Sequence, residues 1–272
     1  MEIKNDIVRK TISVTLLFFI LCATLPKQGN SQEQTPISYA LVEYFKVKPE
    51  NTEKYLDFVK NFWRPLQQER IAQQEIVRWR FFRVQFTGKN DEYNFVTAAF
   101  FDDFNKLGNL YNIDIQKVHP GKNIDDTMEE IYKVRDLVKT NLLVINSNTV
   151  NSLPAKYLQV NFMNIRQGGE SEYLDVENTI WKPVHQELLN SGAKAGWSVW
   201  SLYFPGGAGL PYQFVAVDDF ADFSQIGKVD YSDAFNKVHK DKNLDELLER
   251  TTKSRILVKS ELWESLDSVF AP

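Results

Sequence analysis

Apolar and polar positions follow two different periods along this chain. The segment 38–47 alternates, with apolar residues on both sides, which predicts a strand whose two faces are covered. The segment 53–74 carries apolar residues at helical spacing, among them Tyr55, Val59 and Phe62, which predicts an amphipathic helix. Turn-forming residues separate the two segments. A strand followed by a helix is therefore expected here.

The pattern continues with a hairpin of two strands, a second helix and a closing strand. These elements are predicted at 76–86, 93–101, 124–134 and 137–145. Pro65 lies inside the first helical pattern, and because proline has no N–H, the helix should kink or restart just before it. The element order is β-α-β-β-α-β.

This unit occurs twice. Five residues, Tyr55, Trp63, Pro65, Glu69 and Trp79, return 118 residues later as Tyr173, Trp181, Pro183, Glu187 and Trp197. Further along, Lys117, His119, Asn123 and Arg135 return 120 residues later as Lys237, His239, Asn243 and Arg255. We therefore predict a first repeat over 38–147 and a second over 157–268, with linkers at 32–37 and 148–156.

Each repeat predicts one antiparallel four-stranded sheet with helices on one face. The other face is also apolar and needs a cover, which the other repeat can supply. The predicted fold class is α+β, with two ferredoxin-like repeats whose sheets form a barrel-like core with helices outside. This arrangement resembles the dimeric α/β-barrel superfamily, which includes antibiotic-biosynthesis-type and heme-degrading monooxygenases and the NIPSNAP group, here with the two subunits fused in tandem. The resemblance covers Ser38 to Ser268 in element order and carries no diagnostic motif, so it transfers no active-site residue.

The first 31 residues have the pattern of a secretion signal. A basic start precedes an apolar run of 15 residues, Thr11 to Leu25, which is short of the roughly 20 residues that span a bilayer. Small residues at Gly29 and Ser31 predict cleavage before Gln32. We therefore expect an exported chain, periplasmic or extracellular. An uncleaved anchor and a lipid-modified Cys22 are the alternatives.

Composition narrows the classes of partner. Without the predicted signal the chain has 28 basic and 34 acidic residues and no basic tract, which argues against nucleic acid as a partner. Cys22 is the only cysteine, so no disulfide or thiolate metal site is expected after cleavage. No stable membrane span is expected either. Since the fusion already supplies the usual dimer, we expect a monomer, or a weak homo-oligomer.

Histidine offers the most suggestive candidate chemistry. His119 and His239 occupy matching positions and are two of three histidines in the chain. An imidazole can act as a general base, contact a ligand or bind a metal, so both are candidate catalytic residues. Alternatively, their recurrence reflects the shared origin of the repeats, and each ring bonds a neighbouring backbone group.

Arginine and tryptophan supply candidate ligand-binding residues. Arg135 and Arg255, placed at the end of the second helix of each repeat, can clamp a carboxylate or else pair with an internal acid. Trp63 and Trp181 can wall a pocket opened by the proline break or serve as core anchors. His185, which replaces Gln67 in the second repeat, completes the set.

Metal and cofactor signals are weak. His185 and His239 could approach each other, but their spacing matches no known metal motif, so no metal is assigned. The sequence requires no cofactor, and the resemblance alone makes heme conceivable. We expect the protein to bind a small apolar or aromatic ligand in a helix–sheet cleft. A heme-linked or oxygenase-like enzyme and a purely structural module are the alternatives, so enzymatic activity stays open.

Overall fold

The computed structural model describes residues 37–110, 113–149 and 155–271. The predicted signal, its cleavage site and Cys22 lie outside these ranges. Within them, no helix has both the length and the apolar character needed to cross a membrane.

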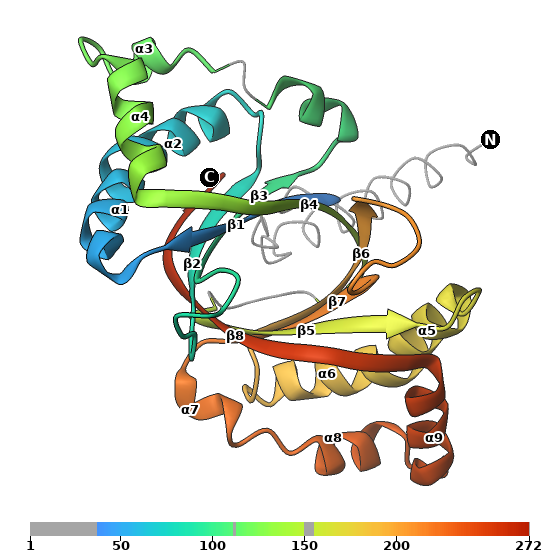
Figure 1. Ribbon diagram of the computed structural model, residues 1–272. Helices are drawn as coiled ribbons and strands as arrows, with labels where there is room; N and C mark the ends of the chain where they lie inside the picture. The colour runs from blue at the N-terminus through green and yellow to red at the C-terminus, as the bar shows by residue number, and fades with distance from the viewer. Residues whose placement is uncertain (1–36, 111–112, 150–154, 272) are drawn as a thin grey trace, which may run out of the picture. The chain divides into compact units, whose positions relative to one another are not determined.

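Eight antiparallel strands close into one barrel (Figure 1) in the order β1-β3-β2-β8-β5-β7-β6-β4. The first repeat contributes a sheet of four neighbouring strands, and the second repeat contributes the other four. The sheets join edge to edge, because β2 pairs with β8 and β4 pairs with β6. The strands are β1 (Tyr39–Val47), β2 (Arg78–Val84), β3 (Phe95–Phe101), β4 (Arg135–Asn148), β5 (Tyr157–Ile165), β6 (Gly196–Phe204), β7 (Phe214–Phe220) and β8 (Arg255–Phe270).

Helices lie outside the barrel wall, as Figure 1 shows. The first repeat carries α1 (Thr52–Phe58), α2 (Arg64–Ala72), α3 (Ile115–Val118) and α4 (Ile124–Val134), with short 3-10 turns at Pro49–Asn51 and Phe104–Asn109. The second carries α5 (Glu170–Val176), α6 (Lys182–Asn190), α7 (Phe223–Ile226), α8 (Tyr231–Val238) and α9 (Leu244–Ser254). The predicted α+β class, the two ferredoxin-like repeats and the helices outside are confirmed.

The helix break predicted at each proline takes the form of a π-helical turn. In the first repeat this turn is Val59–Trp63, between α1 and α2, and Pro65 follows in the first turn of α2. In the second it is Glu177–Trp181, with Pro183 in the same place in α6. Because a π-turn shifts the hydrogen-bond register by one residue, each helix continues past its proline.

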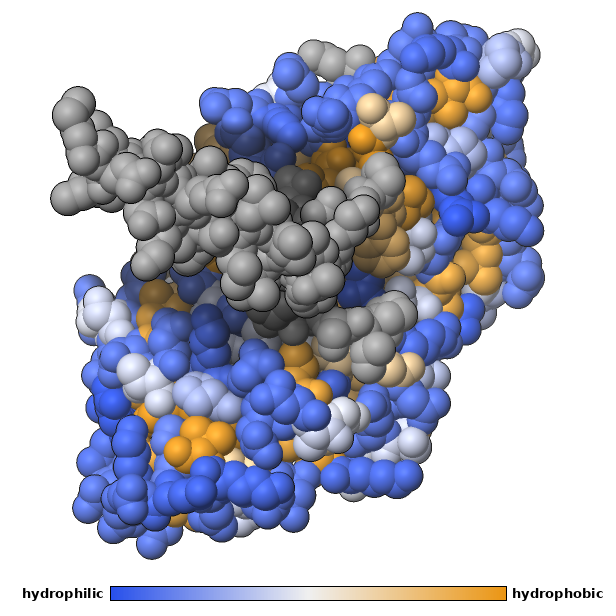
Figure 2. Space-filling view, turned by 180° about the vertical axis from the view of Figure 1, so that it is seen from behind, coloured by the Kyte–Doolittle hydropathy of each residue, from blue (hydrophilic) through white to orange (hydrophobic). Residues whose placement is uncertain are grey.

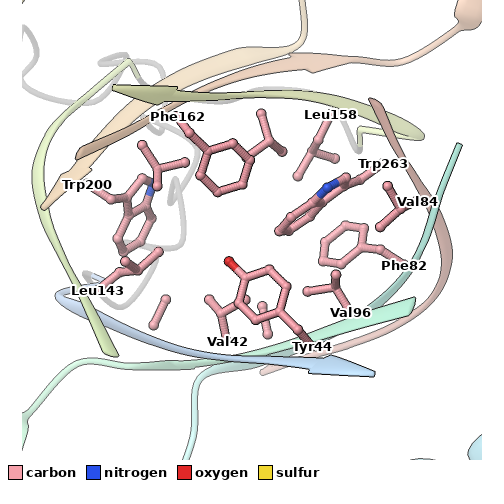
Figure 3. Packing of buried hydrophobic residues seen from close by; sticks show 14 of the residues in the cluster. Val42, Tyr44, Phe82, Val84, Val96, Leu143, Leu158, Phe162, Trp200 and Trp263 are labelled. Carbon is pink, nitrogen blue, oxygen red and sulfur yellow. The ribbon is translucent and has the colours of Figure 1, made fainter. Parts of the chain in front are cut away.

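The barrel interior is a shared core (Figure 3). Tyr44 and Phe82 from the first repeat pack there with Phe162, Trp200 and Trp263 from the second. The Trp263 ring lies 5.5 Å from Phe82 and 6.1 Å from Tyr44, centroid to centroid. Each sheet therefore covers the inner face of the other, as expected.

Separate apolar clusters lie between the sheets and the helices. Phe45, Tyr55 and Trp79 belong to the cluster of the first repeat, and Tyr173 and Trp197 to that of the second. Hydrophilic residues cover most of the face in Figure 2, where apolar residues form separate patches. The helix–sheet layer thus holds a second set of buried residues, distinct from the barrel interior.

The structure corrects the placement of the two arginines. Helix α4 ends at Val134 and α9 at Ser254, so Arg135 and Arg255 are the first residues of β4 and β8. Both have extended backbone angles. As strand residues they begin the two strands that pair with β1 and β5.

Candidate functional site

A cavity of about 400 Å³ lies between the helices and the outer face of the sheet in the first repeat. It is bounded by α1, the π-turn, α2 and α4 on one side and by β1, β2, β3 and β4 on the other. Most lining residues are apolar or aromatic, among them Leu41, Val59, Leu66, Trp79, Ala99 and Met128. Such a volume and lining are typical of small-ligand sites.

Strand alternation explains which side chains reach the cavity. On β1, Ala40, Val42 and Tyr44 belong to the barrel core, so Leu41 and Glu43 project to the helix side. On β3, Ala99 lies on the helix side, and its small side chain leaves space beneath the π-turn. The cavity therefore follows from the pleat of the sheet and from one small residue.

Tyr55 contributes a buried hydroxyl to the cavity. The residue is 0% exposed, Arg135 lies close to its oxygen, and its O–H has no acceptor among the described residues. Burial raises the pKa of Tyr55 to about 12, although nearby Arg135 acts to lower it. The phenol therefore stays protonated at physiological pH and is a hydrogen-bond donor.

Arg135 supplies a cation to the same cavity. Its guanidinium lies over three aromatic rings, 4.0 Å from the Phe45 centroid, 5.1 Å from Trp63 and 5.8 Å from Tyr55. Among the described residues, no carboxylate lies within ion-pair distance of Arg135. The ion pairs of the surrounding helices are made by other cations, Lys54, Arg64, Arg70 and Lys117. Aromatic faces thus hold Arg135 in place without neutralising its charge.

Other polar groups of the cavity are engaged with protein partners. Glu43 accepts a hydrogen bond from Thr97 Oγ1 at 3.2 Å. Arg70 pairs with Glu75 at 3.2 Å and donates to the Gln67 side chain at 3.2 Å. Among the described residues of the lining, the Tyr55 O–H and the Trp63 Nε1–H have no acceptor, and Arg135 has no carboxylate partner.

The matching place in the second repeat holds a carboxylate. Arg255 donates to Glu177, which stands where the first repeat has Val59 and is 1% exposed. Burial raises the pKa of Glu177 to about 7, while Arg255 and the Tyr173 phenol lower it. The Tyr173 hydroxyl is thus close to Glu177, although the two form no hydrogen bond of ordinary geometry.

A second buried cluster fills the rest of that region. Lys194 is 1% exposed and donates to Asp218, to His185 Nδ1 at 2.9 Å and to the Tyr231 hydroxyl at 3.2 Å. Burial and the charge of Lys194 hold the pKa of His185 well below its usual value, so its ring is neutral. Asp218 replaces Ala99, and His185 replaces Gln67, both of which line the cavity of the first repeat.

The two predicted tryptophans differ in their partners. Trp63 lines the cavity, and its buried Nε1 has no hydrogen-bond partner among the described residues. Trp181 donates from Nε1 to Thr251 Oγ1 at 3.1 Å. The residue that matches Thr251 in the first repeat is Ile131, which has no hydroxyl to offer.

The two matched histidines hold backbone groups. His119 Nε2 bonds the Phe62 carbonyl at 3.0 Å, and His239 Nε2 bonds the Ile180 carbonyl at 3.0 Å. Both acceptors belong to the π-turns, and both histidines are 7% exposed. Neither ring lines the cavity, and His185 lies in a separate network from His239.

The donor set of the cavity does not fit heme. Heme iron takes an axial histidine, cysteine, methionine or tyrosinate. No histidine or cysteine lines this cavity, and its buried Tyr55 keeps its proton. Met128 lines it, but a methionine ligates heme together with a histidine, which the lining lacks. Within the described ranges, no group of three His, Cys, Asp or Glu side chains is placed to hold a metal ion.

Comparison with known proteins gives information on the fold alone. No protein-family model matches the chain, and no curated protein sequence matches it. Among solved structures, a candidate monooxygenase from Fusobacterium nucleatum is 8% identical with a TM-score of 0.56, over 86% of this chain and 94% of that one. A candidate monooxygenase from Lactobacillus acidophilus is 9% identical with a TM-score of 0.50, over 86% and 96%.

A heme-binding protein from Thermus thermophilus is 8% identical over 86% of this chain and 95% of that one, with a TM-score of 0.48. This similarity is too low to carry an argument about ligands. The fold of the chain is that of the dimeric α/β-barrel superfamily, which confirms the resemblance seen in the sequence. The two halves of one chain take the places of the two subunits.

Sequence reasoning identified Arg135 and Trp63 but missed three residues. Tyr55 and Tyr173 recur as a matched pair, but Tyr55 was interpreted only as part of the helical stripe and Tyr173 only as its repeat. Glu177 occupies the position of the helical pattern where the first repeat has Val59. An acid in place of an apolar residue was the signal in the sequence that could have identified it.

Proposed function

We propose that the first repeat binds a small, largely apolar or aromatic ligand in the cavity between α1, α2, α4 and the sheet. The observation that carries this proposal is the cavity itself, about 400 Å³ in volume and lined mainly by apolar side chains. A core of ordinary packing density leaves few voids larger than a water molecule. The same region of the second repeat contains Glu177, His185 and Asp218 instead.

The histidines have a structural role in this proposal. Each is buried and bonds a π-turn carbonyl, which supports a contribution to helix geometry rather than to catalysis. Export remains a prediction from the N-terminal sequence, and its test is N-terminal sequencing of the protein from the producing cell. An oxygenase-like activity finds no support in the lining residues beyond the shared fold.

Calorimetric titration of the purified protein with naphthalene tests the proposal. Binding with a heat and a rise in melting temperature is expected. Ala99→Leu, which fills the cavity, should remove it, whereas Ala98→Leu, on the barrel face of the same strand, should retain it in the folded fraction. If naphthalene and its carboxylate and amide derivatives all fail to bind the folded protein, the cavity is not a ligand site.

A further inference from the structure

The two repeats share a pair of hydrogen-bond donors, a tyrosine and an arginine, but differ at a position beside that pair. Tyr55 matches Tyr173, and Arg135 matches Arg255, but Val59 stands where the second repeat has Glu177. The second repeat therefore shows which chemical group this pair of side chains accommodates. That group is a carboxyl, held by the arginine and lying beside the phenol.

In the first repeat the donors are present and the carboxyl is missing. Val59 is 3% exposed and belongs to the cavity wall, and both Tyr55 and Arg135 line the same space. The Tyr55 hydroxyl is fully buried, and although Arg135 lies close enough to donate to its oxygen, no described residue accepts its proton. A buried donor without an acceptor costs about 1–3 kcal/mol. A ligand that accepts this hydrogen bond recovers that energy.

We propose that the cavity selects an apolar or aromatic molecule bearing one carboxylate, which lies between Arg135 and Tyr55. This inference rests on the proposed function. The guanidinium presents a planar fork that matches a carboxylate, and the three rings around Arg135 fix its position before the ligand arrives. The body of the ligand contacts the apolar wall formed by Val59, Leu66 and Ala99.

The solvent exposure of the cavity lowers the cost of placing a charge there. Tyr132 and Leu137 line the cavity and are 64% and 55% exposed, so water reaches this space. Glu177 in the second repeat, by contrast, is almost completely buried. Glu43 is the one acid in the cavity lining, and its bond to Thr97 places it on the sheet face, outside ion-pair distance of Arg135. A ligand carboxylate at Arg135 therefore keeps part of its hydration and meets a cation.

The test compares 2-naphthoate, its neutral isostere 2-naphthamide, and naphthalene by calorimetry at pH 8. The carboxylate should bind at least about tenfold more tightly than the amide, as expected for a charge-assisted hydrogen bond. Val59→Glu transplants the second repeat's carboxyl into the first and should abolish this preference. Val59→Gln, of equal size, is the matched control and should weaken all three probes while retaining most of the preference.

Each outcome decides between the two proposals. If naphthalene binds but the carboxylate is no better than the amide, Arg135 is only a structural cation and this inference fails, while the ligand site stands. A carboxylate preference that survives in folded Val59→Glu also overturns it. If no probe binds the folded wild type, the proposed function itself fails. Arg135→Gln, where it folds, should lose the preference without losing naphthalene.

Discussion

Replacing Glu177 by glutamine should stabilise the protein above pH 7, even though it removes the charge of one partner in an ion pair. The Glu177 side chain is 1% exposed, and burial outweighs the attraction of Arg255, so its pKa is raised from 4.5 to about 7. Glutamine has nearly the same shape, still accepts a hydrogen bond from Arg255, and brings no charge to desolvate.

The sign follows from proton binding. Folded Glu177 keeps its proton up to about pH 7, whereas in the unfolded chain the carboxyl ionises near 4.5. Between these pH values the folded state binds more protons than the unfolded state. The protonated Glu177 carboxyl therefore stabilises the fold fully below pH 4.5, and this contribution is lost as the pH rises through 7. A shift from 4.5 to about 7 corresponds to roughly 3 kcal/mol at most, at about 1.36 kcal/mol per pKa unit.

Urea denaturation followed by tryptophan fluorescence, repeated between pH 4.5 and 8.5, measures this effect. The two proteins should have similar free energies of unfolding at the acid end, and the variant should gain on the wild type as the pH rises. The lowered pKa of His185 acts in both proteins and cancels in the difference. Glu249→Gln is the control: because Lys253 lowers the pKa of exposed Glu249 from 4.5, the contribution of this carboxylate is present above that pH, and the variant should not gain on the wild type as the pH rises from 4.5 to 8.5.

Parallel pH profiles of the wild type and Glu177→Gln would refute the reasoning. They would mean that the carboxyl has the same pKa in both states, so that Arg255 fully offsets its burial. A variant that loses stability with rising pH would show more directly that the ion pair dominates desolvation. Either result would also change what is expected for a carboxylate held by Arg135.

Two further substitutions test hydrogen bonds of the helix layer by urea denaturation. Thr251→Val removes the acceptor of Trp181 Nε1 and should lower the free energy of unfolding by about 1–3 kcal/mol. The control Thr252→Val should cost less, because it loses only a hydroxyl bond to the helix backbone, of the kind that Thr251 also makes, on the exposed face of α9. Equal costs would contradict a role for the indole bond. His119→Phe keeps the stacking on Phe62 at 4.7 Å but removes the donor to its carbonyl, and should also cost about 1–3 kcal/mol; an unchanged free energy of unfolding would mean that this bond contributes nothing.

The fold was predictable because two periods in the sequence agree with each other. Alternation over the strands and helical spacing between them specify β-α-β-β-α-β, and the recurrence of Trp63 and Pro65 as Trp181 and Pro183 fixes the repeat. The barrel was predicted as well, but the pattern did not show which strands pair to close it. The closure depends on β4 and β8 extending past their own sheets to pair with β6 and β2, which is a matter of strand length and register.

The candidate site was only partly predictable. Arg135 and Trp63 were identified as candidates and line the cavity. His119 was predicted either as a catalytic residue or as a ring that bonds neighbouring backbone; it lies outside the lining and bonds the Phe62 carbonyl. A sequence shows that a residue recurs, yet it does not show which side of the helix the side chain occupies after a π-turn shifts the register by one residue. The cavity depends on Ala99, a small residue whose importance is evident only in three dimensions.

Internal duplication makes one half of this protein a reference for the other. Tyr173 and Arg255 surround a carboxyl that belongs to the chain, and their counterparts Tyr55 and Arg135 surround a space. If both pairs served stability alone, an acid would be expected at position 59 as well as at position 177, because a partly buried cation without a partner is costly. The chain instead has Val59, which widens the cavity and leaves the cation facing it. A carboxyl supplied by a ligand would give Arg135 the partner that Glu177 gives Arg255, as proposed above.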